Sequence, residues 1–123
     1  MSYDVGLQID VGGEVPFSIS GPLNYTYNMS YAIRHGCITV YACTCEAACT
    51  CGAAHLFCLA GATAGDAIEP LTRAIEIIKR DAVALRAREP TNGWGSVDGL
   101  LRHFLEPLLA MCREAPKATI WCR

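Results

Sequence analysis

The chain has 123 residues, the size of one domain, and a formal net charge of −2 that comes from ten Lys and Arg against twelve Asp and Glu. This charge excludes the basic surface that binding to nucleic-acid polymers requires, although a small charged ligand is still compatible with it. Hydrophobic residues make up 52% of the chain, but no run approaches the length of a membrane-spanning helix, so we predict no membrane association. The high apolar content also predicts a homo-oligomer.

The N-terminal stretch "MSYDVGLQID" has neither the basic segment nor the continuous apolar segment of a secretory signal. We therefore expect a cytoplasmic protein in a reducing compartment. In that setting the eight cysteines are expected to be thiols, metal ligands or reactive groups rather than structural disulfides.

The N-terminal third is predicted to form a small sheet. Residues 3–11 alternate apolar and polar side chains, which indicates a half-buried strand. Gly12 and Gly13 permit a turn, after which residues 15–20 alternate again and form an antiparallel partner. Pro16 suggests that this partner lies at an edge of the sheet. After Gly21 and Pro22 a third alternating run covers residues 23–29.

The next segment, residues 28–36, is predicted to be a short helix that Asn28 or Ser30 caps and Gly36 ends. Residues 37–42 have the β-branched and aromatic content of a strand. The Ala-, Cys- and Gly-rich stretch that follows, up to residue 64, fits a loop or a weak helix equally well.

The first long helix is predicted to start near Asp66, whose side chain can cap it while Glu69 closes a capping box. Its apolar stripe consists of Ile68, Leu71, Ile75, Ile78, Ala82 and Leu85. Two i,i+4 ion pairs are expected outside this stripe, Glu69 with Arg73 and Glu76 with Arg80. Pro70 is tolerable if it lies at or near the first turn.

A second long helix begins at Ser96 and ends before Pro116, with Pro107 expected to kink it by removing a hydrogen bond. Its apolar side carries Leu101, Phe104, Leu105, Leu108 and Cys112. The final "KATIWCR" is predicted to be a short strand that returns to the sheet. We therefore expect residues 1–123 to form a single α+β domain, with two longer helices covering one face of a small, mostly antiparallel sheet.

The first candidate ligand site is the turn that contains Asn92, Gly93, Trp94, Gly95 and Ser96. The two glycines allow turn geometries closed to other residues, and Ser96 can cap the following helix. Backbone N–H groups at such a helix start commonly hold a phosphate or carboxylate, and the tryptophan can lie flat against a base or sugar. The alternative interpretation is a tryptophan that is merely packed under a helix.

A second candidate is the row formed by Asn24, Thr26 and Asn28, which alternation places on one face of a strand. These side chains can donate and accept hydrogen bonds, so they either bind a polar ligand or are paired within the protein. Arg34 is a candidate cation for an anionic ligand, and Arg102, His103 and Arg123 are further sources of positive charge.

The cysteine-rich segment contains a C-x-C-x3-C-x-C pattern formed by Cys43, Cys45, Cys49 and Cys51. Thiolates suit Zn²⁺, and these four can reach a tetrahedral arrangement if the backbone turns between Cys45 and Cys49. Structural zinc sites more often use wider spacings within each pair. Unliganded thiols, a zinc site and disulfides therefore all stay open, and no other cofactor is indicated.

Three stretches together resemble a family of small proteins of uncharacterised function encoded by tailed phages and prophages: "MSYDVGLQID", "LNYTYNMSYAIR" and "EPTNGWGSVDGLLRHFLEPLLAMCREAPKATI". The resemblance covers most of the chain apart from residues 37–65, and members of the family lack the cysteine cluster. It implies a phage accessory protein that acts in the cytoplasm of a bacterial host cell.

These observations favour a non-enzymatic protein that binds and sequesters a small nucleotide-like ligand, such as a host-defence signal. An enzyme is not favoured, because Cys112 and His103 are expected to point away from each other and no nucleotide-hydrolase or metalloprotease motif is present. The alternatives are an inhibitor or adaptor that docks a host protein, and a zinc-stabilised structural module.

Overall fold

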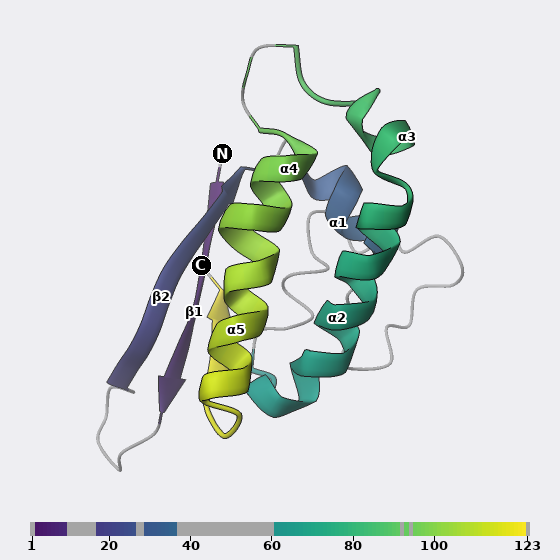
Figure 1. Cartoon of the computed structure of the whole chain (residues 1–123). Helices are drawn as coiled ribbons and strands as arrows, with labels where there is room; N and C mark the ends of the chain where they lie inside the picture. The colour runs from purple at the N-terminus through teal and green to yellow at the C-terminus, as the bar shows by residue number, and fades with distance from the viewer. Residues whose placement is uncertain are drawn as a thin grey trace.

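The structure is a computed structural model that describes residues 2–9, 17–26, 29–36, 61–91, 93 and 95–122. It has an α+β fold with a three-stranded antiparallel sheet, which confirms the predicted fold class (Figure 1). That both long helices cover one face of the sheet stays a prediction. The elements are β1 (Ser2–Ile9), β2 (Phe17–Thr26), α1 (Ser30–Gly36), α2 (Ala64–Arg80), α3 (Ala82–Arg86), α4 (Val97–Leu100), the π-helical η2 (Leu101–Leu105), α5 (Glu106–Glu114) and β3 (Thr119–Cys122).

The central strand of the sheet is β1, which pairs antiparallel with β2 on one side and with β3 on the other. The alternation in its sequence has the predicted effect, because Val5 and Leu7 are fully buried while Asp4 and Gln8 are only partly buried. The C-terminal strand returns to the sheet as predicted, with Ile120 opposite Leu7.

The second and third alternating runs of the sequence were expected to be separate strands, and this prediction is wrong. They form one strand, β2, which continues through Gly21 and Pro22. The pairing register shifts at this point, with Val5 opposite Leu23 but Leu7 opposite Ser20. Gly21 and Pro22 of β2 therefore lie opposite the single residue Gly6 of β1. This arrangement is a β-bulge, and it allows the strand to continue past the two residues. Because β2 is an outer strand of the sheet that the structure describes, the missing N–H of Pro22 does not interrupt a ladder between β1 and β3.

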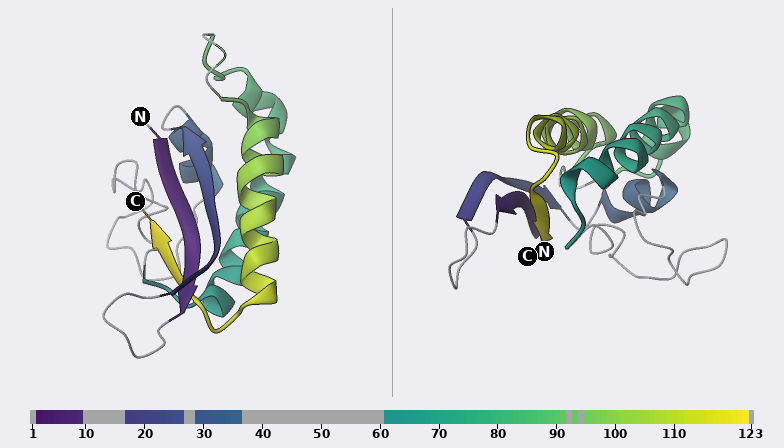
Figure 2. Two further views of the ribbon diagram at one scale, coloured as in Figure 1. Left: turned by 90° about the vertical axis from the view of Figure 1, so that its left-hand side faces the viewer. Right: turned by 90° about the horizontal axis from the view of Figure 1, so that it is seen from below.

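The helices α4, η2 and α5 follow one another as a single rod beside the sheet, and α2 runs next to this rod in the opposite direction (Figures 1 and 2). The side chains of Val5, Leu7 and Ile120 belong to the same buried cluster as residues from α2 and from the rod. The largest fully buried side chains of that cluster are Phe104, Leu7, Met29, Ile33, Leu71, Ile78, Leu105, Leu108 and Ile120. One core therefore joins the sheet to the helices.

The start of α2 differs from the prediction, because the helix begins at Ala64 and Asp66 does not cap it. Thr63 occupies the cap position without a side-chain hydrogen bond. The chain enters α2 directly from backbone pairing with β3, since Gly61 N donates to Ile120 O at 2.8 Å and Ala64 N donates to Ala118 O at 2.8 Å. This pairing starts the helix two residues earlier than the sequence indicated. Pro70 consequently lies inside the helix rather than in its first turn.

The predicted apolar stripe of α2 and α3 is buried, except that Ile68 is only partly covered. Outside the stripe, the expected pair of Glu69 with Arg73 is present at 3.9 Å between highly exposed side chains. Arg80 instead donates to the neighbouring Asp81, at 3.0 Å from Nε and 2.9 Å from Nη2. Arg80 thus pairs with the carboxylate of the next residue, Asp81, rather than with the predicted partner Glu76.

The irregularity near Pro107 is the π-helical segment η2, which ends two residues before the proline, and the predicted kink itself stays a prediction. The N–H of Glu106 bonds to the carbonyl of Leu101, five residues earlier. A wider turn accommodates a residue that has no N–H and whose ring crowds the preceding turn. The helix then continues as α5 to Glu114, which confirms that it ends before Pro116.

A cluster of polar contacts attaches α1 to the junction between α2 and α3. His35 Nε2 lies 2.7 Å from Asp81 Oδ2. The hydroxyl of Tyr31 donates to the Leu85 carbonyl at 2.9 Å, and the Arg88 guanidinium lies 4.7 Å from the centre of the Tyr31 ring. Asp81, where α2 gives way to α3, is thus the point where the two helical segments meet α1.

We expect Asp81→Asn to reduce the acid sensitivity of this protein. Hydrogen bonds from Arg80 and then from His35 hold the pKa of Asp81 well below its usual range. A carboxyl whose pKa is lower in the folded state stabilises the fold above its unfolded pKa of about 4, and this contribution is lost as the pH falls below that value. The wild-type Tm should therefore fall more between about pH 5 and pH 2 than that of the variant, by a modest amount because the side chain is partly exposed and its ion pairs are screened by solvent.

Thermal unfolding monitored by circular dichroism across this pH range measures the effect. Glu69→Gln is the matched control, because Glu69 has only the long, exposed pair with Arg73. Equal pH dependence of the Tm in wild type and Asp81→Asn would contradict the prediction.

Candidate ligand-binding site

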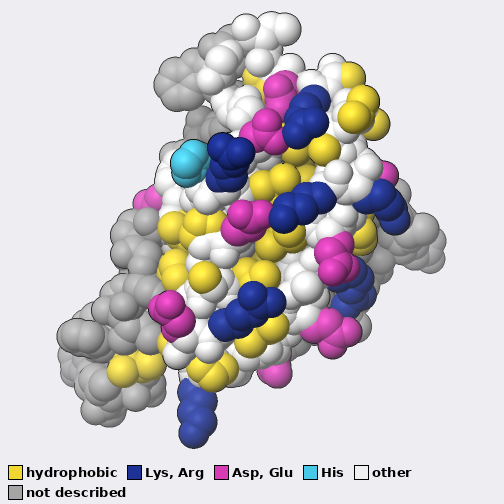
Figure 3. Space-filling model, in the orientation of Figure 1, with side chains coloured by type: hydrophobic (Ala, Val, Ile, Leu, Met, Phe, Trp, Pro, Cys, Tyr) yellow, Lys and Arg dark blue, Asp and Glu magenta, His cyan; other side chains and the backbone are white. Residues whose placement is uncertain are grey.

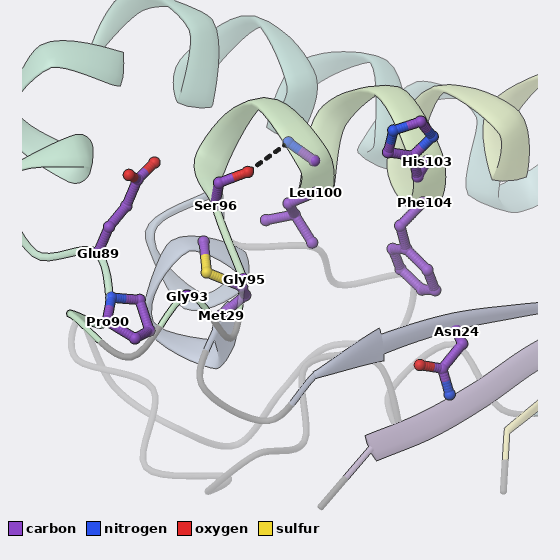
Figure 4. Close-up of a pocket in the computed structure, with 11 residues that line it drawn as sticks. Asn24, Met29, Glu89, Pro90, Gly93, Gly95, Ser96, Leu100, His103 and Phe104 are labelled. Atoms are coloured by element: carbon purple, nitrogen blue, oxygen red, sulfur yellow. Dashed lines mark hydrogen bonds between the residues drawn. The ribbon is translucent and has the colours of Figure 1, made fainter.

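A pocket of about 480 Å³ opens between the start of α4, the η2 segment, β2 and the residue that precedes α1 (Figure 4). Five residues that the sequence analysis names as candidates line it, namely Asn24, Gly93, Gly95, Ser96 and His103. The first lies on β2 and the others lie about seventy positions later, so the fold brings two separate candidate segments to one cavity. The volume lies within the range of small-molecule sites in proteins, roughly 300–1,000 Å³.

Ser96 caps α4, as predicted from the sequence. Its Oγ accepts a hydrogen bond from the Gly99 N–H at 2.9 Å, and its backbone is extended as the cap position requires. A second side chain also binds this turn, because Glu89 Oε1 accepts from the Val97 N–H at 2.8 Å. Glu89 was not predicted as a site residue, and its only signal in the sequence is an acidic residue just before Pro90.

These two contacts change the interpretation of the helix start as a phosphate site. The N–H groups of Val97 and Gly99 are already bound by protein oxygens, and one of these oxygens belongs to a carboxylate. An incoming phosphate would meet the negative charge of Glu89. The turn is therefore better suited to a ligand that donates hydrogen bonds.

Both glycines of the turn have backbone angles that other residues rarely adopt, with φ of 78° at Gly93 and 111° at Gly95. This agrees with the role expected for them, since only glycine takes such angles without strain. The turn brings the chain from the Glu89–Pro90 wall of the pocket to the Ser96 cap.

The side chain of Asn24 is exposed and donates from Nδ2 to Asp4 Oδ1 at 2.8 Å, across the β1–β2 pair. This residue therefore lines the pocket and has a partner within the protein. Of the other predicted ligands, Thr26 lies on β2 and Arg34 on α1, but their side chains are outside what the structure describes. The residues wholly outside the described ranges are Asn28, Asn92, Trp94, Cys43, Cys45, Cys49, Cys51 and Arg123.

Apolar side chains form much of the remaining wall. Met29, Leu100 and Phe104 are buried, and Pro90 is partly buried. The prediction that Phe104 belongs to the core is confirmed. That it also lines the pocket was not predicted. The exposed His103 of η2 completes the lining and brings an imidazole to it.

Positive charge gathers elsewhere, in a second hollow of about 300 Å³ between α2–α3 and the rod. Two ion pairs cross this hollow, Lys79 with Glu106 at 2.8 Å and Arg86 with Asp98 at 2.7 Å. Arg102, a predicted source of positive charge for the ligand, lines this second hollow and not the pocket. Lys and Arg side chains alternate with Asp and Glu across the corresponding face (Figure 3).

Cys112 is the one cysteine whose side chain is described, and it is fully buried. Burial raises the pKa of its thiol to about 11, so at neutral pH the thiol is protonated and a poor nucleophile. His103 is exposed, so these two residues do not form a catalytic pair. Within the described part of the chain, no group of three or more His, Cys, Asp or Glu side chains is placed to hold a metal ion.

Comparison with known proteins gives no match: no protein family, no curated protein and no solved structure is significantly similar to this chain. Among the helices that the structure describes, none has the length and apolar character needed to cross a bilayer.

We expect Ser96→Ala to lower the free energy of unfolding by about 1 kcal/mol, because the Gly99 N–H loses its partner at the start of α4. Urea denaturation of both proteins measures the difference. Thr72→Ala serves as the control, since the Thr72 hydroxyl bonds only to the Ile68 carbonyl in the middle of a helix. An unchanged midpoint for Ser96→Ala would show that the cap does not stabilise the helix.

Proposed function

We propose that this protein binds and sequesters a small nucleotide-like ligand in the pocket between β2 and the start of α4, without converting it chemically. The observation that supports this most is the shared cavity of Asn24, Gly93, Gly95 and Ser96, which come from two segments distant in the sequence. Buried apolar walls and a few polar groups at the edge are the usual composition of a small-molecule site. The phage accessory role suggested by the resemblance fits a protein that removes a signal from solution.

Binding without turnover is supported by the groups that line the pocket. Its described polar side chains are those of Asn24, Glu89, Ser96 and His103. Glu89 and Ser96 are both engaged with backbone N–H groups of the helix start. A nucleophile with an adjacent base, which covalent catalysis needs, is not present among them.

The test is a thermal-shift series with nucleosides, mononucleotides and cyclic nucleotides. A ligand at one hundred times its Kd adds about 2.7 kcal/mol of stability and raises the Tm accordingly. Asn24→Ala should weaken the response, whereas Asp4→Ala is the matched control, because it removes the same hydrogen bond without changing the lining. If no compound in the series raises the Tm of the wild-type protein, the proposal is wrong.

The alternative functions predict different results. An adaptor that docks a host protein needs exposed apolar surface, and Val83, at 82% exposed, is the one large hydrophobic side chain described as exposed. That observation supports the small-ligand proposal more than the adaptor, for which the test is recovery of a host protein in a pull-down.

A zinc-stabilised module would release one zinc ion and unfold on chelation. Native mass spectrometry tests the proposed homo-oligomer together with bound metal.

A further inference from the structure

We infer that the pocket selects a guanine-type base, which pairs its two adjacent N–H donor groups with the carboxylate of Glu89. This inference rests on the proposed function and specifies which part of a nucleotide-like ligand enters the cavity. It differs from the sequence-based expectation, in which the phosphate faced the helix start.

The charge of the pocket lining favours a ligand that donates hydrogen bonds. Among the described residues that line the pocket, Glu89 is the one carboxylate, and neither Lys nor Arg contributes. Lys79, Arg86 and Arg102 line the second hollow, where Lys79 pairs with Glu106 and Arg86 with Asp98. Arg88, next to Glu89 in the sequence, lies over the Tyr31 ring and is not part of the pocket lining. The part of the ligand that enters should therefore offer hydrogen-bond donors, with any phosphate directed to solvent.

The side chain of Glu89 is held in place by the backbone. It is partly buried, and its Oε1 accepts from the Val97 N–H at 2.8 Å, so the backbone of α4 holds the carboxylate in place. Figure 4 shows the Glu89 side chain at the end of the pocket away from Phe104. A carboxylate has about four acceptor positions, so one backbone hydrogen bond leaves capacity for two more. A fixed acceptor with two adjacent oxygens suits a ligand that presents two parallel donors.

The shape and polarity of the remaining pocket wall favour a planar ligand. Figure 4 places Met29 and Leu100 between Glu89 and Phe104, so apolar side chains separate the carboxylate from the His103 end of the pocket. A thioether and aliphatic groups pack well against a flat aromatic ring. A planar base is therefore favoured over a flexible alkylamine, although both could donate to Glu89.

Guanine is the base whose chemistry fits these features. Its ring N–H and exocyclic amino group are neighbouring donors on one edge, whereas adenine presents a donor beside an acceptor there. An adenine bound in the same position would place its ring nitrogen lone pair against a carboxylate oxygen. The pocket should discriminate between the two because a buried acceptor without its donor is costly.

The experiment compares guanosine, inosine and adenosine by isothermal titration calorimetry with the full-length wild-type chain. Guanosine is expected to bind at least about tenfold more tightly than inosine, which lacks the amino group, and more tightly still than adenosine. Glu89→Gln should remove this preference while keeping the fold, because the amide oxygen can still accept from Val97. Glu69→Gln, at an exposed position outside the pocket, should keep it.

The outcomes separate this inference from the proposal on which it rests. If the wild-type protein binds adenosine as tightly as guanosine, and Glu89→Gln changes neither affinity, the ligand-binding proposal stands and the guanine inference is wrong. Preferential binding of an alkylguanidine such as agmatine would also overturn it, since the carboxylate would then bind a cation. If no nucleoside or nucleotide binds, both are overturned.

Discussion

Leu7→Asp should prevent this chain from reaching its native fold at neutral pH. Leu7 is fully buried in the central strand, with β2 on one side and β3 on the other. A carboxylate at this position has no cation in the core to pair with, and its burial costs several kcal/mol in addition to the lost packing. Because a domain of this kind is stable by only about 5–15 kcal/mol, the folded state would lose most of its population.

Far-UV circular dichroism and urea denaturation are the measurements, with Gln8→Asp as the matched control. Gln8 is the next residue of the same strand and is only partly buried on the opposite face. Both changes introduce the same residue, which is unfavourable in strands, so the difference between them isolates burial. A cooperative transition of wild-type stability in Leu7→Asp would contradict the position of the core described above.

Phe104→Ala is expected to lower the free energy of unfolding by about 3–5 kcal/mol. The ring is 1% exposed, and it is among the largest fully buried side chains. Its removal enlarges the cavity that the ring lines, and the cost depends on how little the surrounding core can collapse into the space. The variant should therefore also bind the ligand more weakly, because the wall opposite Glu89 is lost.

Equilibrium urea denaturation gives the change in stability, and Val83→Ala is the control. Val83 is 82% exposed, so its truncation should change stability by less than about 0.5 kcal/mol. A loss of similar size in the two variants would show that Phe104 does not act through burial.

The parts of the fold that follow from local pattern were predictable from the sequence. The alternation around Val5 and Leu7 gave the correct inward face of β1, and Ser96 before an apolar run marked a helix cap. Both signals depend on residues close together in the chain, where spacing alone decides which side chains share a face. The turn signal did not by itself place Gly93, Gly95 and Ser96 at a cavity, because that cavity also needs Asn24 of β2.

The errors arose where a distant segment determines the local structure. Asp66 looked like a cap, but pairing of residues 61–64 with β3 starts the helix earlier. Gly21 and Pro22 looked like a turn, but their pairing partner β1 keeps the strand intact through a bulge. Glu89 was missed because its partner Val97 lies eight residues away across a turn whose course the sequence does not reveal. Each case needed a long-range contact that no local pattern encodes.

The bulge in β2 also affects how copies of this protein behave when they are concentrated. Within the described sheet, β2 is an outer strand, where exposed backbone groups offer a template for cross-β aggregation. Pro22 supplies no N–H to such a template, and the register shift at Gly21 breaks its regular spacing. We expect this irregular edge to pair less readily with a second copy of the chain than a regular outer strand would.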